Sequence, residues 1–159
     1  MKRATLLALI LMAHATFADV GWRDADGNPI PDTEFQKSVR GFGGLLVVTP
    51  DKDWEEKWNT PPEVAPQFSS ASTVEVGGEL FILTMFTNPK VDRSGAADVV
   101  LDLEVKRPDG SMSTDAESAI CFQGELRSPP HNVYLCATVV GFAGEPSDPR
   151  GTWSVQITI

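Results

Sequence analysis

Closely spaced glycine and proline residues divide this chain into short runs of β-branched and aromatic residues, a pattern typical of strands joined by turns. The sequence has 159 residues, of which 13 are Gly and 12 are Pro. The most regular run, residues 98–106, alternates between apolar and charged side chains with a period of two, which indicates a strand with one buried face. Its apolar face contains Val99, Leu101, Leu103 and Val105, and its charged face contains Asp98, Asp102, Glu104 and Lys106.

About seven such runs are predicted to be strands. They lie at residues 43–49, 72–76, 79–88, 98–106, 119–126, 132–142 and 153–159. We therefore predict an all-β fold, an antiparallel β-sandwich of about seven strands with one short helix. Residues 81–86 are apolar on both faces, which predicts a strand at the centre of the packing. We expect the core to lie between the apolar face of 98–106 and the face of Trp153, Val155 and Ile157.

The N-terminus has the three parts of a secretory signal peptide. Basic residues precede an apolar run at 6–12, and the small residues Thr16 and Ala18 precede a cleavage site. An uncleaved amphipathic helix is the alternative, but this run is apolar on all sides. The run is shorter than the roughly 20 residues that span a bilayer, so we predict no membrane span. We predict a signal peptide over 1–18, a single domain over 19–159, and a periplasmic or secreted location.

Export would place the two cysteines of the chain in an oxidising compartment, where thiols pair. Cys121 and Cys136 lie in the runs 119–126 and 132–142, which are separated by a turn around Pro129. We predict a structural disulfide between them, across a β-hairpin formed by these two runs. A redox pair is the alternative, but the Cys-x-x-Cys spacing is absent.

One segment, from Thr49 to Trp58, breaks the strand pattern and predicts one short helix. Thr49 can cap this helix, Pro50 can take its first position, and Pro61 can end it. Trp54 and Trp58 would then lie on one helix face. Two roles remain open for this pair: a lid over one end of the core, or an exposed aromatic pair that binds a partner. We expect the solvated face of the helix to contain Asp51, Asp53, Glu55 and Glu56.

The charge and the reactive residues of the chain exclude several functions. The formal net charge is −9, whereas nucleic acid and anionic lipid need a basic surface, so we expect neither as a partner. Beyond the signal peptide, His131 is the single histidine, and the cysteines near it are expected to be oxidised. No catalytic or phosphate-binding motif is present, so we predict no catalytic residues, no cofactor and no enzyme. A hydrolase that uses an acidic pair such as Glu55 and Glu56 is the enzymatic alternative.

A polar loop near the N-terminus offers oxygen ligands at Asp24, Asp26 and Asn28. It does not fit an EF-hand, because Pro29 stands where the sharp-turn glycine is required and Phe35 where the bidentate glutamate is required. We predict an Asp-Gly turn here and no metal site.

Two segments carry a family resemblance. The closing segment, from Asp148 to Ile157, resembles the last strands of bacterial immunoglobulin-like domains. The block Thr49–Trp58, with the prolines that follow it and Phe68, is similar to a group of uncharacterised exported bacterial proteins. The resemblance covers most of residues 19–159 and implies an immunoglobulin-like β-sandwich, but it implies no activity.

These observations lead to two alternative functions. The first is a non-enzymatic, exported binding or structural module of the bacterial envelope, whose partner we expect to be a protein. The second is an acidic inhibitor of a basic secreted enzyme such as a lysozyme, guided to its target by the negative surface. Trp54 and Trp58 are the candidate binding residues for either function.

Overall fold

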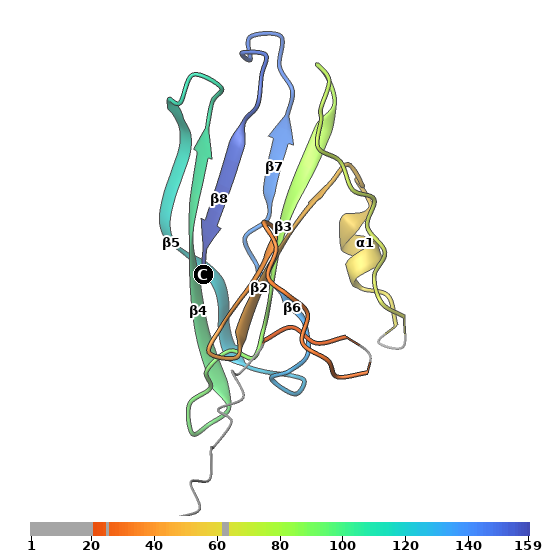
Figure 1. The fold of residues 1–159 in the computed structure, drawn as a ribbon, viewed down its shortest axis with the longest axis vertical. Coiled ribbons are helices and arrows are strands. Elements are labelled where there is room, and N and C mark those ends of the chain that lie inside the picture. The colour runs from red at the N-terminus through yellow and green to blue at the C-terminus, as the bar shows by residue number, and fades with distance from the viewer. Residues whose placement is uncertain (1–20, 25, 62–63) are drawn as a thin grey trace, which may run out of the picture.

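The computed structural model describes residues 21–24, 26–61 and 64–159. The predicted signal peptide and its cleavage site lie outside these residues. The described chain forms eight strands and one short helix (Figure 1). In chain order these are β1 (Gln36–Val39), β2 (Phe42–Thr49), α1 (Trp54–Trp58), β3 (Glu79–Thr87), β4 (Ala96–Lys106), β5 (Met112–Glu125), β6 (Tyr134–Leu135), β7 (Val140–Ala143) and β8 (Ser154–Thr158).

The strands form two antiparallel sheets that pack face to face (Figure 1). The large sheet has five strands, in the order β1-β2-β3-β6, with β7 also paired to β3. The small sheet has three strands, in the order β5-β4-β8. The predicted all-β sandwich with one short helix is confirmed.

The core lies between the two sheets and is centred on Phe86 of β3, which is fully buried. The rings of Phe42 and Tyr134 stack on Phe86 from neighbouring strands of the large sheet. Phe122 reaches it from the small sheet, with 5.9 Å between the ring centroids. The apolar face predicted for β4 is buried against this cluster, and its members are Val99, Leu101, Leu103 and Val105.

The apolar face of β8, the other half of the predicted core, does not lie where we expected it. β8 pairs with β4, so that Ile157 lies opposite Leu103 and Val155 lies opposite Val105. The apolar face of β8 therefore extends the face of β4 within one sheet and does not oppose it. The prediction that these two faces pack against each other is wrong, because alternation shows which face of a strand is apolar but not which strands pair.

The central strand β3 is covered on both faces, as its continuous apolar run predicts. Phe86 faces the small sheet, whereas Leu83 and Met85 point the opposite way and are buried as well. On that opposite face, α1 lies over the large sheet (Figure 1). Trp54 of α1 contacts Phe81 of β3, with 6.3 Å between the ring centroids.

Three of the predicted strands differ from the structure, and the sequence predicts no strand at β1. The strand predicted at 119–126 is the second half of β5, which begins at Met112. Residues 72–76 form no strand, and the Glu75 carbonyl accepts a hydrogen bond from the Gly78 amide in a turn. β1 lies in the polar segment near the N-terminus. Its half-buried positions are occupied by the polar residues Gln36 and Ser38, so no alternation of apolar and polar residues marks it as a strand. The predicted strand 132–142 is divided into β6 and β7, which both pair with β3.

The predicted disulfide between Cys121 and Cys136 is present, but the predicted hairpin is wrong. Cys121 belongs to β5 of the small sheet, and Cys136 directly follows β6 of the large sheet. The bond therefore joins the two sheets, and both residues are buried. Beside it, the Ala137 amide donates to the Cys121 carbonyl at 2.7 Å. The hairpin does not form because β5 pairs along its length with β4, while β6 pairs with β3.

Replacing Leu103 by alanine should lower the free energy of unfolding by about 2–5 kcal/mol, because it leaves a cavity between the sheets. Leu103 is 3% exposed. Asp98→Ala on the solvated face of the same strand is the matched control and should change stability by less than about 0.5 kcal/mol. Urea unfolding of both variants measures the difference, and equal losses would contradict the assignment of the two faces.

Replacing both cysteines by alanine should lower the free energy of unfolding by about 2–4 kcal/mol without abolishing the fold. The bond closes a loop with a sequence separation of 15 residues, and this loop is free to open in the reduced, unfolded chain. Guanidinium unfolding of the double variant and of the reduced wild-type protein should give the same midpoint. Two reactive thiols in the unfolded, unreduced protein would show that the bond does not form.

Candidate functional site

The predicted helix forms, but it is shorter than expected and is held by side chains instead of a capped terminus. α1 covers only Trp54–Trp58, and Asp53 at its N-cap position makes no side-chain capping bond. Thr49 is the last residue of β2, and its hydroxyl accepts a hydrogen bond from the Asp51 amide at 3.1 Å. The predicted cap at Thr49 and helical start at Pro50 are therefore wrong.

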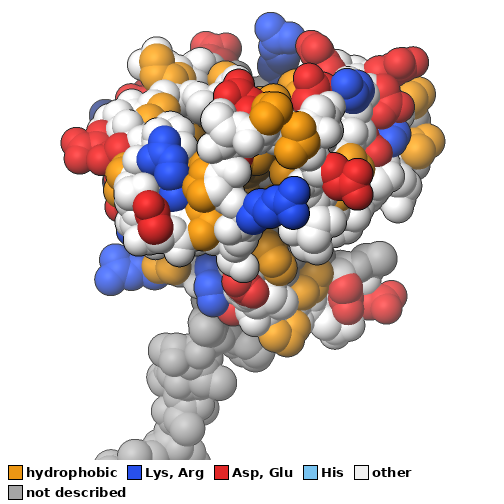
Figure 2. Space-filling model, turned by 90° about the horizontal axis from the view of Figure 1, so that it is seen from above, with side chains coloured by type: hydrophobic (Ala, Val, Ile, Leu, Met, Phe, Trp, Pro, Cys, Tyr) orange, Lys and Arg blue, Asp and Glu red, His pale blue; other side chains and the backbone are white. Residues whose placement is uncertain are grey.

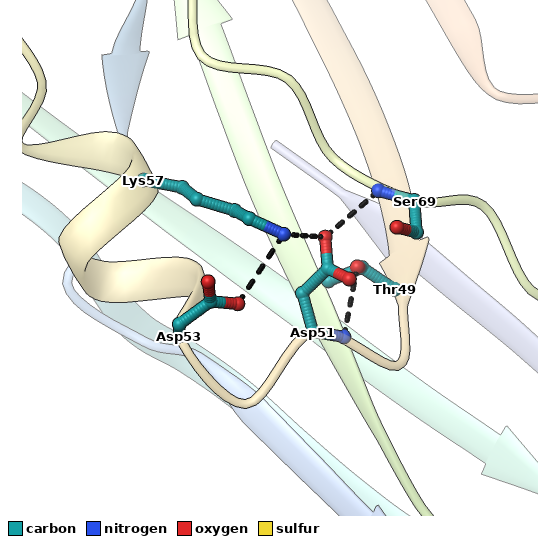
Figure 3. A network of polar contacts seen from close by, with 5 residues as sticks. All are labelled: Thr49, Asp51, Asp53, Lys57 and Ser69. Carbon is teal, nitrogen blue, oxygen red and sulfur yellow. Dashed lines mark hydrogen bonds and ion pairs between the residues drawn. The ribbon is translucent and has the colours of Figure 1, made fainter.

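Asp51 ties α1 to the chain on either side of it (Figure 3). Its carboxylate lies 2.8 Å from the Lys57 ammonium and accepts a hydrogen bond from the Ser69 amide at 2.8 Å. The Asp51 side chain is only 10% exposed, so it does not belong to the solvated helix face on which we expected it. The Lys57 contact, followed by the Ser69 bond, holds the pKa of Asp51 well below its usual value. The same ion pair raises the pKa of Lys57.

Both candidate tryptophans are half-buried in the structure. Trp54 packs on Phe81, which is the contact expected of a lid, although it covers the outer face of the large sheet and not an end of the core. Glu55 and Glu56, between the two tryptophans, are exposed. The arrangement shows how α1 is attached to the sheet, and a binding role of Trp54 and Trp58 stays a prediction.

A second candidate site is a hollow of about 690 Å³ at the lower end of the sandwich in Figure 1, where β3 ends. We call it the end hollow. Segments far apart in the sequence meet there: residues 21–24 with Gly27, residues 40–41, residues 87–88, and His131 with Val133. Its volume lies within the range of small-molecule sites, roughly 300–1,000 Å³.

One wall of the end hollow is built on Trp22, which is only 7% exposed. Its indole nitrogen donates to the Gly44 carbonyl at 3.1 Å. The ring lies so close to β2 that a Cβ on Gly43 would come within 2.7 Å of the indole nitrogen. Glycine at position 43 therefore allows Trp22 to lie flat on the sheet.

Arg40 lines the end hollow from the β1–β2 turn in a conformation that arginine rarely adopts. Arg40 has φ 51° and Gly41 has φ 87°, the pair of positive angles that a two-residue hairpin turn requires. Asn-Gly is the favoured sequence for such a turn, whereas a non-glycine residue in the left-handed region costs roughly 1–2 kcal/mol. An arginine at the first turn position is thus an unfavourable local choice.

Asn88 also lines the end hollow and has a positive φ, 52°, which asparagine adopts readily. Its backbone amide donates to the Pro130 carbonyl at 2.7 Å, and its side chain donates to the Gly21 carbonyl at 3.4 Å. The preceding Thr87 hydroxyl donates to the His131 carbonyl at 3.0 Å. Together these bonds attach the loop before β6 and the N-terminal segment to the end of β3.

The loop that contains Asp24 forms the turn predicted from its sequence. The Asp24 carboxylate accepts hydrogen bonds from the Asp26 and Asn28 amides at 3.0 and 2.8 Å, and from the Asn28 side chain at 3.1 Å. The hydrogen bonds from Asn28 are the main cause that lowers the pKa of Asp24. This carboxylate is therefore already bound to donors of its own turn. On the same loop, Arg23 donates to the Gly27 carbonyl at 2.8 Å.

The negative charge of the chain is not gathered on the face drawn in Figure 2, which looks down on the upper end of the sandwich. Acidic and basic side chains alternate there with apolar ones. Among the described residues, no group of three or more His, Cys, Asp or Glu side chains is arranged to hold a metal ion. The same part of the chain contains no helix that is long and apolar enough to cross a membrane.

The sequence singles out Asp24 and His131 but does not predict that they share a site with the other residues of the end hollow. The four residues that define it most clearly are Trp22, Arg23, Arg40 and Asn88. One signal was available: Val39-Arg40-Gly41-Phe42 has the glycine of a two-residue hairpin turn, with arginine where asparagine is favoured. No local pattern could show that this turn meets residues 87–88 and His131.

Comparisons with protein-family models, with curated proteins and with solved structures gave no match. The functional conclusions therefore rest on the sequence and the geometry.

Replacing Asp51 by asparagine should destabilise the protein at neutral pH, because Lys57 then loses its closest carboxylate. A carboxyl whose folded pKa is lowered stabilises the fold above its unfolded pKa, about 3.9, and this contribution disappears as the pH falls further. The stability difference between wild type and Asp51→Asn should therefore shrink below about pH 4.

Urea unfolding measured between neutral and acidic pH tests this expectation. Asp53→Asn is the control, since Asp53 contacts the same lysine at 3.2 Å but is 56% exposed. It should have the smaller effect. A difference for Asp51→Asn that stays constant with pH would show that the carboxylate charge is not the cause.

Proposed function

We propose that this protein is a non-enzymatic, extracytoplasmic binding module of the bacterial envelope that uses the end hollow. The observation that carries the proposal is the convergence of four distant segments on one hollow at the end of a rigid sandwich. Loops presented by a fixed scaffold are the usual location of binding residues. One residue of this hollow, Arg40, has a positive φ angle that is unfavourable for its side chain, and such local strain is concentrated at functional sites.

The disulfide supports an extracytoplasmic location for this activity. Disulfides form and persist in oxidising compartments, and this bond joins the two sheets of the fold. The signal peptide predicted at residues 1–18 fits the same location. We also propose that the sandwich is of the immunoglobulin-like type, in which recognition loops gather at one end.

The charged side chains of the end hollow support recognition more than catalysis. Its two arginines offer hydrogen-bond donors and no acceptor, so they can hold a group but do not serve as a general base. Asp24, the carboxylate in the lining, is already hydrogen-bonded within its own turn. The lining therefore offers fixed positive charge and hydrogen-bond donors to a partner.

Two matched variants test this proposal. Val133 in the end hollow is 43% exposed, and Val100 on the outer face of β4 is 45% exposed. Val133→Trp should fill the hollow, whereas Val100→Trp adds the same bulk elsewhere. Wild type and Val100→Trp, immobilised and exposed to an envelope extract, should retain the same partner, and Val133→Trp should lose it.

Retention by all three proteins, or by none, would overturn the proposal. A basic secreted enzyme, retained by all three and released by salt, would support the inhibitor function instead, because exposed acids such as Glu55 and Glu56 would then guide binding. Mass spectrometry of the retained proteins decides between these outcomes.

A further inference from the structure

We infer that the end hollow binds an anionic group, a carboxylate or a phosphate, through Arg23 and Arg40. This inference rests on the proposed function and adds the chemistry of the partner. The charged residues of the lining are Arg23, Arg40 and Asp24, so arginine exceeds carboxylate in this hollow. The chain as a whole has 13 basic and 22 acidic residues, which makes such a site exceptional on this protein.

Within residues 21–24, 26–61 and 64–159, neither arginine forms an ion pair. Among the described residues, no carboxylate lies within ion-pair distance of Arg23 or Arg40. The contact that Arg23 makes is with the Gly27 carbonyl at 2.8 Å, a neutral acceptor that orients the guanidinium without cancelling its charge. The guanidinium groups therefore keep their charge available on an otherwise acidic protein.

The conformation of Arg40 indicates that its side chain has a use. The positive φ of 51° would be met at lower cost by asparagine, and the following Gly41 already completes the turn. The turn gains nothing from arginine, whereas Arg40 lines the end hollow with an exposed side chain. A planar guanidinium binds the two oxygens of a carboxylate or a phosphate at once.

The rest of the lining suits a group attached to a larger body. A hollow of about 690 Å³ exceeds what a single carboxylate or phosphate needs. Val133, which is 43% exposed, adds apolar surface, and Thr87 and Asn88 add polar side chains to the lining. We therefore expect the anion to be the charged end of an organic partner.

Titration of the purified protein with inorganic phosphate and, separately, with acetate tests the inference. The readout is the shift of the Gly41 and Gly27 backbone amide signals in nitrogen-15 NMR spectra. We expect saturable shifts at millimolar anion, with the stronger response identifying a phosphoryl or a carboxyl ligand. Absence of a saturable shift with both anions would overturn the inference.

Arg40→Asn separates binding from folding, because asparagine suits the left-handed turn position. It should keep or raise the melting temperature while weakening anion binding about tenfold, the effect of losing one charge-assisted pair. Arg40→Lys should bind with intermediate strength, since it keeps the charge but not the planar fork. Arg150→Asn, on an exposed loop that does not line the hollow, is the control and should bind as wild type does.

Equal weakening by Arg150→Asn and Arg40→Asn would show a diffuse charge effect and overturn the inference, as would unchanged binding by Arg40→Asn. The two proposals fail differently. If Val133→Trp loses the envelope partner while Arg40→Asn retains it, the binding function stands and the anion inference fails. If both variants retain the partner, the binding function fails.

Discussion

Burial of β3 on both faces is the constraint on which the rest of the structure depends. Its alternate side chains, represented by Phe86 and Leu83, are fully buried on opposite sides of one sheet, so each side needs its own cover. The small sheet supplies one cover and contributes the apolar face of β4. On the other side, α1 and Trp22 lie against the large sheet, which explains why a five-residue helix and an N-terminal segment are retained at all.

The covalent link between the sheets closes a loop that contributes two residues, His131 and Val133, to the end hollow. Cys136 follows β6 and is bonded to Cys121 of β5, so this loop is tied to the sandwich at both ends. Hydrogen bonds from Thr87 and Asn88 reach the carbonyls of His131 and Pro130 in that loop. A hairpin disulfide would have stabilised one sheet only. The observed bond instead joins the two sheets.

At the β1–β2 turn, the residue in the chain is not the one that the backbone conformation favours. The turn geometry favours asparagine before glycine, and the chain places Arg40 there with φ 51°. A conflict of this kind is expected where a residue serves a ligand more than the fold. The ion pair of Asp51 and Lys57 differs from this turn, because its charged groups serve the fold. They neutralise each other and attach a short helix to the sheet.

The sequence by itself determined the fold class, the central position of β3, the two faces of β4 and the pairing of the two cysteines. Each of these follows from local periodicity or from the identity of a few residues, such as the alternation from Val99 to Val105. Only the tertiary structure decided that β8 lies beside β4, that the disulfide crosses between sheets, and that Asp51 is held by Lys57. The end hollow belongs to this second group, since Arg40, Asn88 and His131 meet there through strand pairing. Pairing depends on the packing of whole faces, and a local pattern does not record which distant face it will meet.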